Sequence, residues 1–441
     1  MTSEIILALF YLFAQATAIV LLAFSLRRAV LLLAARPPKS LNRPILQFPN
    51  AKRPIPLSSN VVVLIPCRNE AASLLGLFDA LDRLDYPRDR LQAVIVDDGS
   101  TDQTASLAQA WAASRPWARV ISLPKNVGKP QALNEVLTPH PPLLSELLDR
   151  RGGEGGEVIV IYDADHRPAP DSLRALVAPF VEDPRVAGVS GQMRVVNGRA
   201  SPAAFYALVE SHVNQFVAMR AKDRLNLAPA LLGANCAYRL SALQAAGGFR
   251  PGALLEDSDL TLTFALDGWR TRFVEDSVSE HHAPVSLRGY LRQHLRWNRG
   301  FHQVIGGRLS ALWANSRLSL LLKLELTFFA LGYADRLALL AGAFFTLVDW
   351  LRPGVFGFPL AVWLIYFGLP ALEMIAALLI AREPFDMFLR LAYVPFFFLL
   401  DIAIAVWSNV ETLLRRPFTW SAAERTQALT TKNTKRTKES L

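Results

Sequence analysis

The chain has 441 residues, 52% of them hydrophobic, and a formal charge of +9 at pH 7. It is longer than one typical domain, and its apolar runs at residues 5–26 and within 318–411 are long enough to cross a bilayer, which excludes a simple soluble protein. The arginines cluster beside these runs, as topology signals and lipid-headgroup contacts do, so we expect a lipid bilayer and no nucleic acid as a partner. Cys67 and Cys236 are the only cysteines, which argues against a disulfide framework and suits a reducing compartment.

The amino-terminal region, residues 1–35, is predicted to be a transmembrane helix. Glu4 is the only charge before the apolar run, whereas seven Lys and Arg residues and no acid lie between Arg27 and Arg53. Because positive flanks stay in the cytoplasm, we expect the amino terminus outside a bacterial-type inner membrane and the next domain in the cytoplasm. A cleaved signal peptide would carry its charges in front of the apolar run. Residues 36–59, rich in proline and basic side chains, are predicted to be a linker.

Residues 60–286 show alternating strand and helix patterns. Strands are predicted at 61–65, 93–96, 120–123 and 158–162, and helices at 71–84 and 102–113. This rhythm is typical of an α/β fold with a mainly parallel sheet and helices on both faces, which is a Rossmann-like nucleotide-binding layer. The segment 138–157 is long for a connection in such a unit and is predicted to be a surface excursion.

Two acids follow the strand predicted at 158–162. Side chains alternate on an extended backbone, so Asp163 and Asp165 point to the same side, off the carboxyl end of the strand where open α/β sheets hold ligands. Two converging carboxylates repel each other unless a cation lies between them, and oxygen ligands suit Mg²⁺ or Mn²⁺. The alternative interpretation is a solvated loop, because aspartate is common after strands.

Polar residues also follow the first two predicted strands. Asp97 and Asp98 come after 93–96, and the segment from Pro66 to Glu70 comes after 61–65. Turn and capping chemistry explains both segments, but acids at this edge of a sheet also accept hydrogen bonds from a nucleobase or ribose. Lys129 opens a predicted helix, where it is either a surface lysine or a contact for a phosphate.

Four segments, VVVLIPCRNE, VDDGSTD, NVGKPQALN and YDADHRP, occur in an order and spacing that resemble the catalytic domain of glycosyltransferase family 2, which has the GT-A fold. The resemblance covers residues 60–302. It implies a UDP-sugar donor, UDP-N-acetylglucosamine or UDP-glucose, and Mg²⁺ or Mn²⁺ as the cofactor. It assigns the donor nucleotide to Pro66, Glu70, Asp97, Asp98, Lys129 and Asp163, and the metal ion to Asp165 and Asp163.

Later motifs extend the resemblance to the acceptor side. Residues 254–259, LLEDSD, precede a helix predicted at 260–266, and Asp257 or Ser258 is also a candidate helix cap. In the family the last acid of the corresponding motif is the general base, a role that the resemblance assigns to Asp257, next to Glu256 on the acceptor side. Leu255 replaces the family's threonine.

The segment RQHLRW matches the QxxRW motif of the family, which the resemblance assigns to the acceptor and the diphosphate. Helical spacing brings Gln293, Arg296 and Trp297 together. Residues 287–317 are also predicted to contain an interfacial amphipathic helix, since leucines and arginines form separate stripes there. His281 and His282 lack further spaced ligands, which disfavours a metal site at these residues.

Residues 318–411 are predicted to contain further transmembrane helices, near 324–349, 356–381 and 391–410. Three crossings would place the carboxyl terminus outside, whereas the basic residues of 412–441, predicted to be a cytoplasmic or disordered tail, indicate the inside. The sequence leaves this conflict open.

The resemblance implies an inverting enzyme that transfers sugars to a growing β-linked polysaccharide at the membrane in a processive manner. The close alternative is the transfer of one or a few sugars to a ceramide- or diacylglycerol-type lipid. A transport or scaffold protein with an inactive Rossmann-like domain is a third hypothesis, against which the complete set of acids argues. The sequence names neither the sugar nor an accessory membrane subunit.

Overall fold

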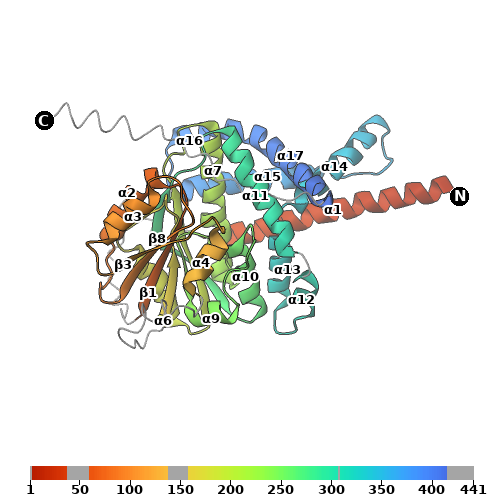
Figure 1. Cartoon of the computed structure of the whole chain (residues 1–441). Coiled ribbons are helices and arrows are strands. Elements are labelled where there is room, and N and C mark those ends of the chain that lie inside the picture. Colours follow the sequence, from red (N-terminus) through yellow and green to blue (C-terminus); the bar gives the residue numbers. More distant parts are fainter. Residues whose placement is uncertain (1, 37–58, 138–156, 306–307, 415–441) are drawn as a thin grey trace, which may run out of the picture.

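The computed structural model describes residues 2–36, 59–137, 157–305 and 308–414. A sheet domain forms one end of the molecule and packed helices form the other, and α1 (Thr2–Ala34) extends away from the sheet towards the amino terminus (Figure 1). Residues 37–58 of the predicted linker, residues 138–156 of the predicted excursion and residues 415–441 of the predicted tail lie outside the described residues.

The described part of the chain contains an eight-stranded sheet with the order β3-β2-β1-β4-β7-β6-β8-β5. Strands β1 to β4 run parallel, β7 is antiparallel to both of its neighbours, and β6 and β8 are parallel to each other. The prediction of a mainly parallel sheet is therefore confirmed, with reversed strands at β7 and at the edge strand β5. The strands are β1 (Asn60–Cys67), β2 (Leu91–Asp97), β3 (Ala118–Ser122), β4 (Glu157–Ile161), β5 (Arg167–Pro168), β6 (Val186–Val195), β7 (Cys236–Arg239) and β8 (Arg270–His281).

The order of the strands changes direction between β1 and β4. From β1 the chain adds β2 and β3 on one side, and it then returns to place β4 on the other side. In open α/β sheets a crevice forms at such a point, outside the carboxyl ends of the strands. Asp163 and Asp165, which follow β4, therefore stand where the topology predicts a ligand site.

The alternation of apolar side chains explains why β1 is buried on both faces. Val61, Val63 and Ile65 belong to one hydrophobic core, and Val62 and Leu64 belong to the other. Helices close both cores, as the sequence predicted. The first core is covered by α2 (Ala71–Asp82), α3 (Thr104–Ala112) and α6 (Ser172–Glu182), and the second by α4 (Lys129–Leu137), α9 (Leu240–Ala245) and α10 (Glu256–Leu266).

Helix α10 begins earlier than its predicted start at residue 260. Leu255 occupies the N-cap position and no side chain caps the helix there. Glu256, Asp257 and Ser258 therefore lie within the first turn rather than in a loop. Carboxylates are favourable in a first turn because they face the positive end of the helix dipole, which explains how acids extend this helix beyond its apolar pattern.

The sheet domain continues into a helical region. Between β6 and β7 the sheet domain also contains α7 (Pro202–His212), the π-helix η1 (Val213–Met219) and α8 (Arg220–Leu225). The helical region consists of α11 (Leu287–Ile305), α12 (Arg308–Ala314), α13 (Leu320–Ala330), α14 (Ala334–Leu351), α15 (Leu360–Ile380), α16 (Phe385–Leu389), the 3₁₀ helix η2 (Arg390–Tyr393) and α17 (Val394–Leu413). In the described chain three helical segments are long and apolar enough to cross a membrane, namely Glu4–Ala34, Leu360–Ile380 and Phe385–Leu413.

The span predicted near 324–349 is divided into two helices. Helices α13 and α14 are bent by 75° relative to each other, and Gly332 lies in the short break between them. They make a fourth candidate span only if the bent pair is counted as one.

Ion pairs tie α1 to the sheet domain and to the other helices. Arg27 lies 2.8 Å from Glu325 of α13, and the same carboxylate lies 3.0 Å from Lys222 of α8. Arg28 lies 2.6 Å from Glu373 of α15. Both carboxylates are nearly fully buried, so these contacts hold the carboxyl-terminal part of α1 against the sheet domain.

Helix α11 is amphipathic, as predicted, but its apolar stripe does not face open space. Leu291 and Leu295 pack against α17, in a cluster that includes Phe397. Arg299 is only 9% exposed and lies 3.3 Å from Glu411 near the end of α17. The expectation that the leucines and arginines of this helix face a leaflet is therefore wrong for Leu291, Leu295 and Arg299, because α17 covers them.

Candidate active site

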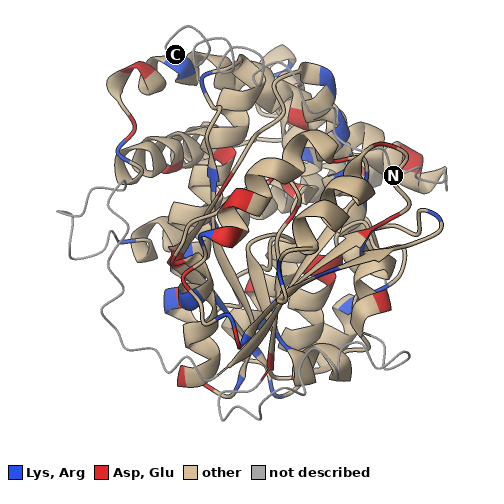
Figure 2. Cartoon of the chain, turned by 60° about the vertical axis from the view of Figure 1, so that its left-hand side comes forward, with Lys and Arg blue, Asp and Glu red and all other residues tan. Residues whose placement is uncertain are grey.

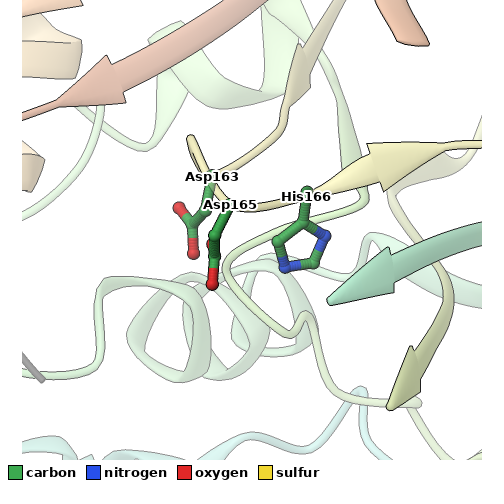
Figure 3. Close-up of side chains that lie close together, drawn as sticks. All are labelled: Asp163, Asp165 and His166. Atoms are coloured by element: carbon green, nitrogen blue, oxygen red, sulfur yellow. The ribbon is translucent and has the colours of Figure 1, made fainter. Parts of the chain in front are cut away.

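Asp163, Asp165 and His166 lie together on the turn after β4. One ligand atom from each lies within 4.8 Å of the others, and the side chains point to the same region (Figure 3). His166 Nδ1 lies 3.0 Å from the hydroxyl of Ser279 on β8. If Nδ1 donates to that hydroxyl, Nε2 keeps its lone pair for a metal ion. The motif predicted the two aspartates as ligands but not His166, although this residue directly follows Asp165.

The donor set fits a divalent cation. Carboxylate oxygens suit Mg²⁺ and Mn²⁺, and an imidazole nitrogen favours a transition-metal ion such as Mn²⁺. His281, which the sequence disfavoured as a ligand, stacks on His166 with the ring centroids 5.2 Å apart. Burial and the neighbouring His166 lower the pKa of His281 to about 4, so this ring is neutral at pH 7.

Lys129 joins the two acidic segments of the site. As the first residue of α4 it reaches Asp163 Oδ1 at 2.9 Å, Glu256 Oε1 at 3.2 Å and the carbonyl oxygen of Gly233 at 2.9 Å. Burial by itself lowers the pKa of Lys129, but the charges of Asp163 and Glu256 outweigh burial and raise it above its usual value. Lys129 is therefore a permanent cation inside the site rather than a surface lysine.

Asp257 stands beside this cation. A β-carbon added to Gly233 would lie 2.9 Å from Asp257 Oδ2 and 3.6 Å from Lys129 Nζ, so the bare glycine backbone makes room for both groups. Burial, followed by the charge of Glu256, raises the pKa of Asp257 to about 7, while Lys129 and Arg296 act in the opposite direction. A carboxylate with a pKa near 7 is suited to accept a proton at neutral pH.

Asp97 and Asp98 lie at the carboxyl end of β2, and both are nearly fully buried. Asp97 Oδ1 accepts a hydrogen bond from the amide of Ser100 at 3.2 Å. Asp98 accepts from the amides of Val127 at 2.6 Å and Gly128 at 2.9 Å. Both oxygens of Asp98 thus hold the loop that positions Lys129, which is a structural task that the sequence did not indicate.

Pro66 and Glu70 lie at the same edge of the sheet. Pro66 pairs with Val96 of β2, and Glu70 precedes α2, with its backbone amide donating to the hydroxyl of Thr104 at 2.8 Å. Because β1, β2 and β4 are parallel, the residues at their carboxyl ends that are predicted to bind the donor nucleotide lie at one edge of the sheet.

The QxxRW residues lie on α11, and they differ in their surroundings. Arg296 is close enough to Asp257 to lower the pKa of that carboxyl group. Trp297 packs against the cluster that contains Leu255, so a large part of its indole contacts protein rather than an open cleft. Gln293 is half-buried on the same helix. The structure thus brings Arg296 into the site of Asp257, whereas no contact of Gln293 with that site is observed among the described residues.

The charge of the chain does not form a basic face in the view of Figure 2, where acidic and basic positions of the described residues are interspersed. Arg27 and Arg28 form ion pairs with Glu325 and Glu373, and the expectation that the arginines mark topology and contact lipid headgroups stays a prediction.

The mainly parallel sheet with an acidic turn after β4 defines a fold of the GT-A class. The sequence profile described as glycosyltransferase like family 2 matches residues 59–300, which is more than half of the chain. The protein therefore belongs to glycosyltransferase family 2.

Curated relatives carry several activities. A probable glycosyltransferase, YdaM of Bacillus subtilis, is 28% identical over 270 residues, 61% of each chain. An N-acetylglucosaminyltransferase of Rhizobium meliloti is 30% identical over 57% of each chain. A beta-monoglucosyldiacylglycerol synthase of Nostoc is 26% identical over 55% of this chain and 49% of its own length. The matches thus span about half to three fifths of these relatives.

A solved structure supports the fold over nearly the whole chain. The mannosyltransferase PcManGT of Pyrobaculum calidifontis, in complex with GDP-Man and Mn²⁺, has a TM-score of 0.57 and 25% identity. The comparison covers 92% of this chain and 100% of that one. The relatives use different sugars, so family membership does not assign a donor or an acceptor here.

Proposed function

We propose that the protein is an inverting, metal-dependent glycosyltransferase that transfers a sugar from a UDP-sugar, UDP-N-acetylglucosamine or UDP-glucose, to an acceptor at the membrane. The observation that carries this proposal is the contact of Lys129 with both Asp163 and Glu256. This contact joins the acidic turn after β4 to the first turn of α10, where Asp257, next to Glu256, has a carboxyl group with a raised pKa. Donor-side and acceptor-side groups thus share one site.

In this proposal Asp257 is the general base. Its carboxylate takes the proton of the acceptor hydroxyl while that oxygen forms a bond to the anomeric carbon of the sugar and the bond from this carbon to the diphosphate breaks. The electron pair of the broken bond leaves with the nucleoside diphosphate. A single in-line displacement of this kind inverts the anomeric centre, so an α-linked donor gives a β-linked product. General base catalysis contributes about 10² to 10⁴ in rate.

The other side chains bind and orient the donor. Asp163, Asp165 and His166 would hold a divalent cation, which supplies neutralisation of the leaving diphosphate when bound. Arg296 places a guanidinium near Asp257, where it suits a diphosphate oxygen. Asp98 keeps Lys129 in place through the backbone of Val127 and Gly128.

For the acceptor we propose a growing β-linked polysaccharide, extended processively. The support is the position of α11, which carries QxxRW between the catalytic residues and the apolar helix α17. A lipid acceptor is the second candidate, favoured by the relative named as a beta-monoglucosyldiacylglycerol synthase. Both acceptors suit a site that is flanked by apolar helices.

The test is a nucleotide-release assay on membranes that contain the full chain. UDP-N-acetylglucosamine, UDP-glucose and GDP-mannose are compared with Mg²⁺ or Mn²⁺, and the labelled product is sized, with Asp257→Asn membranes as the control. Long polymer from one UDP-sugar is the expected result. A short, organic-soluble product would replace the polymer by a lipid acceptor, and release from GDP-mannose alone would overturn the UDP assignment.

We also propose that the catalytic domain and the carboxyl-terminal end of α17 lie on the cytoplasmic side, with α1, the bent pair of α13 and α14, and α15 as the crossings. Both ends of the apolar segment 385–413 contact the sheet domain or α11: Asp386 lies 2.7 Å from Arg199, and Glu411 lies 3.3 Å from Arg299. A helix tied at both ends to one domain does not deliver the chain to the far side of a bilayer. This arrangement places the basic tail in the cytoplasm. It therefore removes the conflict between the tail and three carboxyl-terminal crossings, which would have placed the carboxyl terminus outside.

Cysteine labelling tests this orientation, because natural Cys67 and Cys236 are buried. In intact cells an impermeant maleimide should label Thr2→Cys and Pro353→Cys, the latter in the connection between α14 and α15. Leu414→Cys should react only after the membrane is opened. Labelling of Leu414→Cys in intact cells would overturn the proposal.

A further inference from the structure

A second group of metal-ligating side chains lies between the sheet domain and the apolar helices. Glu210 of α7, His294 of α11 and Asp401 of α17 each offer a ligand atom, and these atoms all lie within 4.8 Å of one another. His294 and Asp401 are both only 2% exposed. The three residues come from three helices that are distant in sequence, and none of them belongs to the site described above.

The contact between His294 and Glu210 requires a proton or a cation between the two side chains. Its Nδ1 lies 3.1 Å from the backbone carbonyl oxygen of Tyr290, which only accepts, so Nδ1 carries a proton. Its Nε2 lies 3.0 Å from Glu210 Oε2, and a carboxylate also only accepts. A neutral imidazole would therefore direct a lone pair at a carboxylate. Either a second proton or a metal ion must lie between the two atoms.

The charge of the surroundings favours a divalent ion over a proton. Glu210, Asp401 and Asp335 contribute three negative charges, and Arg336, which pairs with Asp335 at 2.6 Å and faces Asp401, contributes one positive charge. This set sums to 1 − 3 = −2 with a neutral His294. A proton on His294 leaves this set with a net charge of −1, although Glu210 is 33% exposed, whereas a divalent cation brings the sum to zero. Buried charges are stable chiefly when they are compensated.

The residues around this group resemble the supporting contacts of a metal site. The hydroxyl of Tyr206 donates to Asp401 Oδ2 at 3.0 Å, and that of Tyr290 donates to Oδ1, which orients the carboxylate and leaves each oxygen a lone pair. The Nδ1 contact of His294 fixes its tautomer in the same way.

A buried polar side chain borders the group without a protein partner. Asn298, one helical turn beyond His294 on the same side of α11, is 1% exposed, and neither of its amide atoms has a partner in the described part of the chain. Helices α11 and α17 run parallel here, because Tyr290 contacts Asp401 and Arg299 contacts Glu411 further along both helices. Ser408 of α17 therefore lies near the level of Asn298. It is buried too, and its hydroxyl also lacks a partner among the described residues. Such groups are normally satisfied by water, and water also completes the shell of a bound ion.

We propose that Glu210, His294 and Asp401 bind one divalent transition-metal ion of the Zn²⁺ class. One imidazole and two carboxylates are the ligand types of such ions. The ion would join α7 of the catalytic domain to α11 and to α17. It is a positioning site, because it fixes the helix that carries Arg296 and Trp297 without touching the reacting atoms.

The experiment uses the purified full chain in detergent, in an Asp165→Asn background that weakens the first metal site. Zinc is titrated after chelation and dialysis, and bound metal is measured by elemental analysis. We expect one equivalent of zinc, and at least about tenfold weaker binding in His294→Ala and in Asp401→Asn. His302→Ala, on the same helix but outside the group, should bind like the parent.

A second readout separates ligation from loss of folding. Co²⁺ added to the parent should give visible ligand-field bands that His294→Ala lacks, while both proteins keep the same gel-filtration profile. The absence of saturable zinc binding in the parent, or equal zinc binding in His294→Ala, would overturn the proposal and assign a protonated imidazole to the Glu210 contact. Neither outcome tests whether the protein transfers a sugar, because the nucleotide-release assay measures that separately.

Discussion

The ammonium group of Lys129 lies 2.9 Å from the carboxylate of Asp163, which ties the first residue of α4 to the turn after β4. The same nitrogen lies 3.2 Å from Glu256. Lys129 therefore compensates two carboxylates that belong to opposite ends of the proposed reaction, and its removal should affect both stability and proton transfer.

The substitution Lys129→Met leaves these carboxylates without a cation. Breaking a buried ion pair costs about 3–5 kcal/mol, and the partial exposure of these side chains, 25% for Lys129 and 34% for Asp163, should reduce the loss to roughly 1–3 kcal/mol. Thermal unfolding of the purified protein measures the loss. Lys125→Met, on the exposed part of the same loop, is the control and should unfold like the parent. An unchanged unfolding temperature in Lys129→Met would show that the ion pair contributes no stability.

The substitution Asp257→Asn removes the proposed base while keeping the shape of the side chain. We expect kcat to fall by about 10² to 10⁴, with binding of the nucleoside diphosphate largely kept. Turnover and nucleotide titration on the same preparation separate the two effects. Asp267→Asn, at the exposed far end of α10, is the matched control. Turnover near that of the parent in Asp257→Asn would assign the base to another residue.

The pH dependence follows from the raised pKa of Asp257, which is about 7 in the folded protein and near 4 in an unfolded chain. Because a base must be ionised, kcat/KM should rise with pH up to about 7 and then level off. The stability of the folded protein changes with pH in the opposite direction. The folded state binds more protons than the unfolded state between about pH 4 and 7, so this group makes the protein less stable as the pH rises through that window. Rate profiles and unfolding at several pH values check both signs.

The substitution Gly233→Ala tests the close approach of the backbone to Asp257. The added methyl group would lie 2.9 Å from Asp257 Oδ2, and the φ of +76° is strained for alanine. Gly247→Ala has the same strain, with φ at +79°, but meets no atom within 4 Å. We expect both variants to lose roughly 1 kcal/mol of stability and only Gly233→Ala to lose turnover, by about tenfold or more. Equal turnover in the two variants would contradict the assigned geometry.

The substitution His166→Gln tests the third candidate ligand of the first metal site. Without the imidazole nitrogen, Mn²⁺ should bind at least about tenfold more weakly, and the preference for Mn²⁺ over Mg²⁺ should decrease. Free Mn²⁺ measured by electron paramagnetic resonance gives the affinity without an activity assay. His282→Gln, an exposed neighbour on β8's end, should bind Mn²⁺ like the parent. Parent-like binding in His166→Gln would remove this residue from the site.

Local rules account for much of the fold and part of the site. The apolar run from Val61 to Ile65 predicted a strand, which β1 confirms, and its side chains enter both hydrophobic cores of the sheet. The spacing of Asp163 and Asp165 predicted their convergence, which the structure also shows. These predictions succeed because strand periodicity and the carboxyl edge of a parallel sheet depend on neighbouring residues only.

Other features depend on contacts between distant segments. Nothing near Asp98 in the sequence shows that its oxygens are taken by the amides of Val127 and Gly128. Leu291 and Leu295 have the pattern of a lipid-facing stripe, but α17 covers them. The start of α10 was predicted too late because its first turn is made of acids rather than apolar residues.

The sequence by itself determined the α/β class, the apolar segments, the acidic turn at Asp163 and the family, because periodicity, hydropathy and motif spacing are properties of the chain read in order. Only the tertiary structure decided that Lys129 connects Asp163 to Glu256, that Gly233 leaves room for Asp257, and that Glu210, His294 and Asp401 meet. Each of these contacts joins residues that are far apart along the chain. Their distances, burial and pKa values follow from how helices pack on a sheet, which no local pattern records.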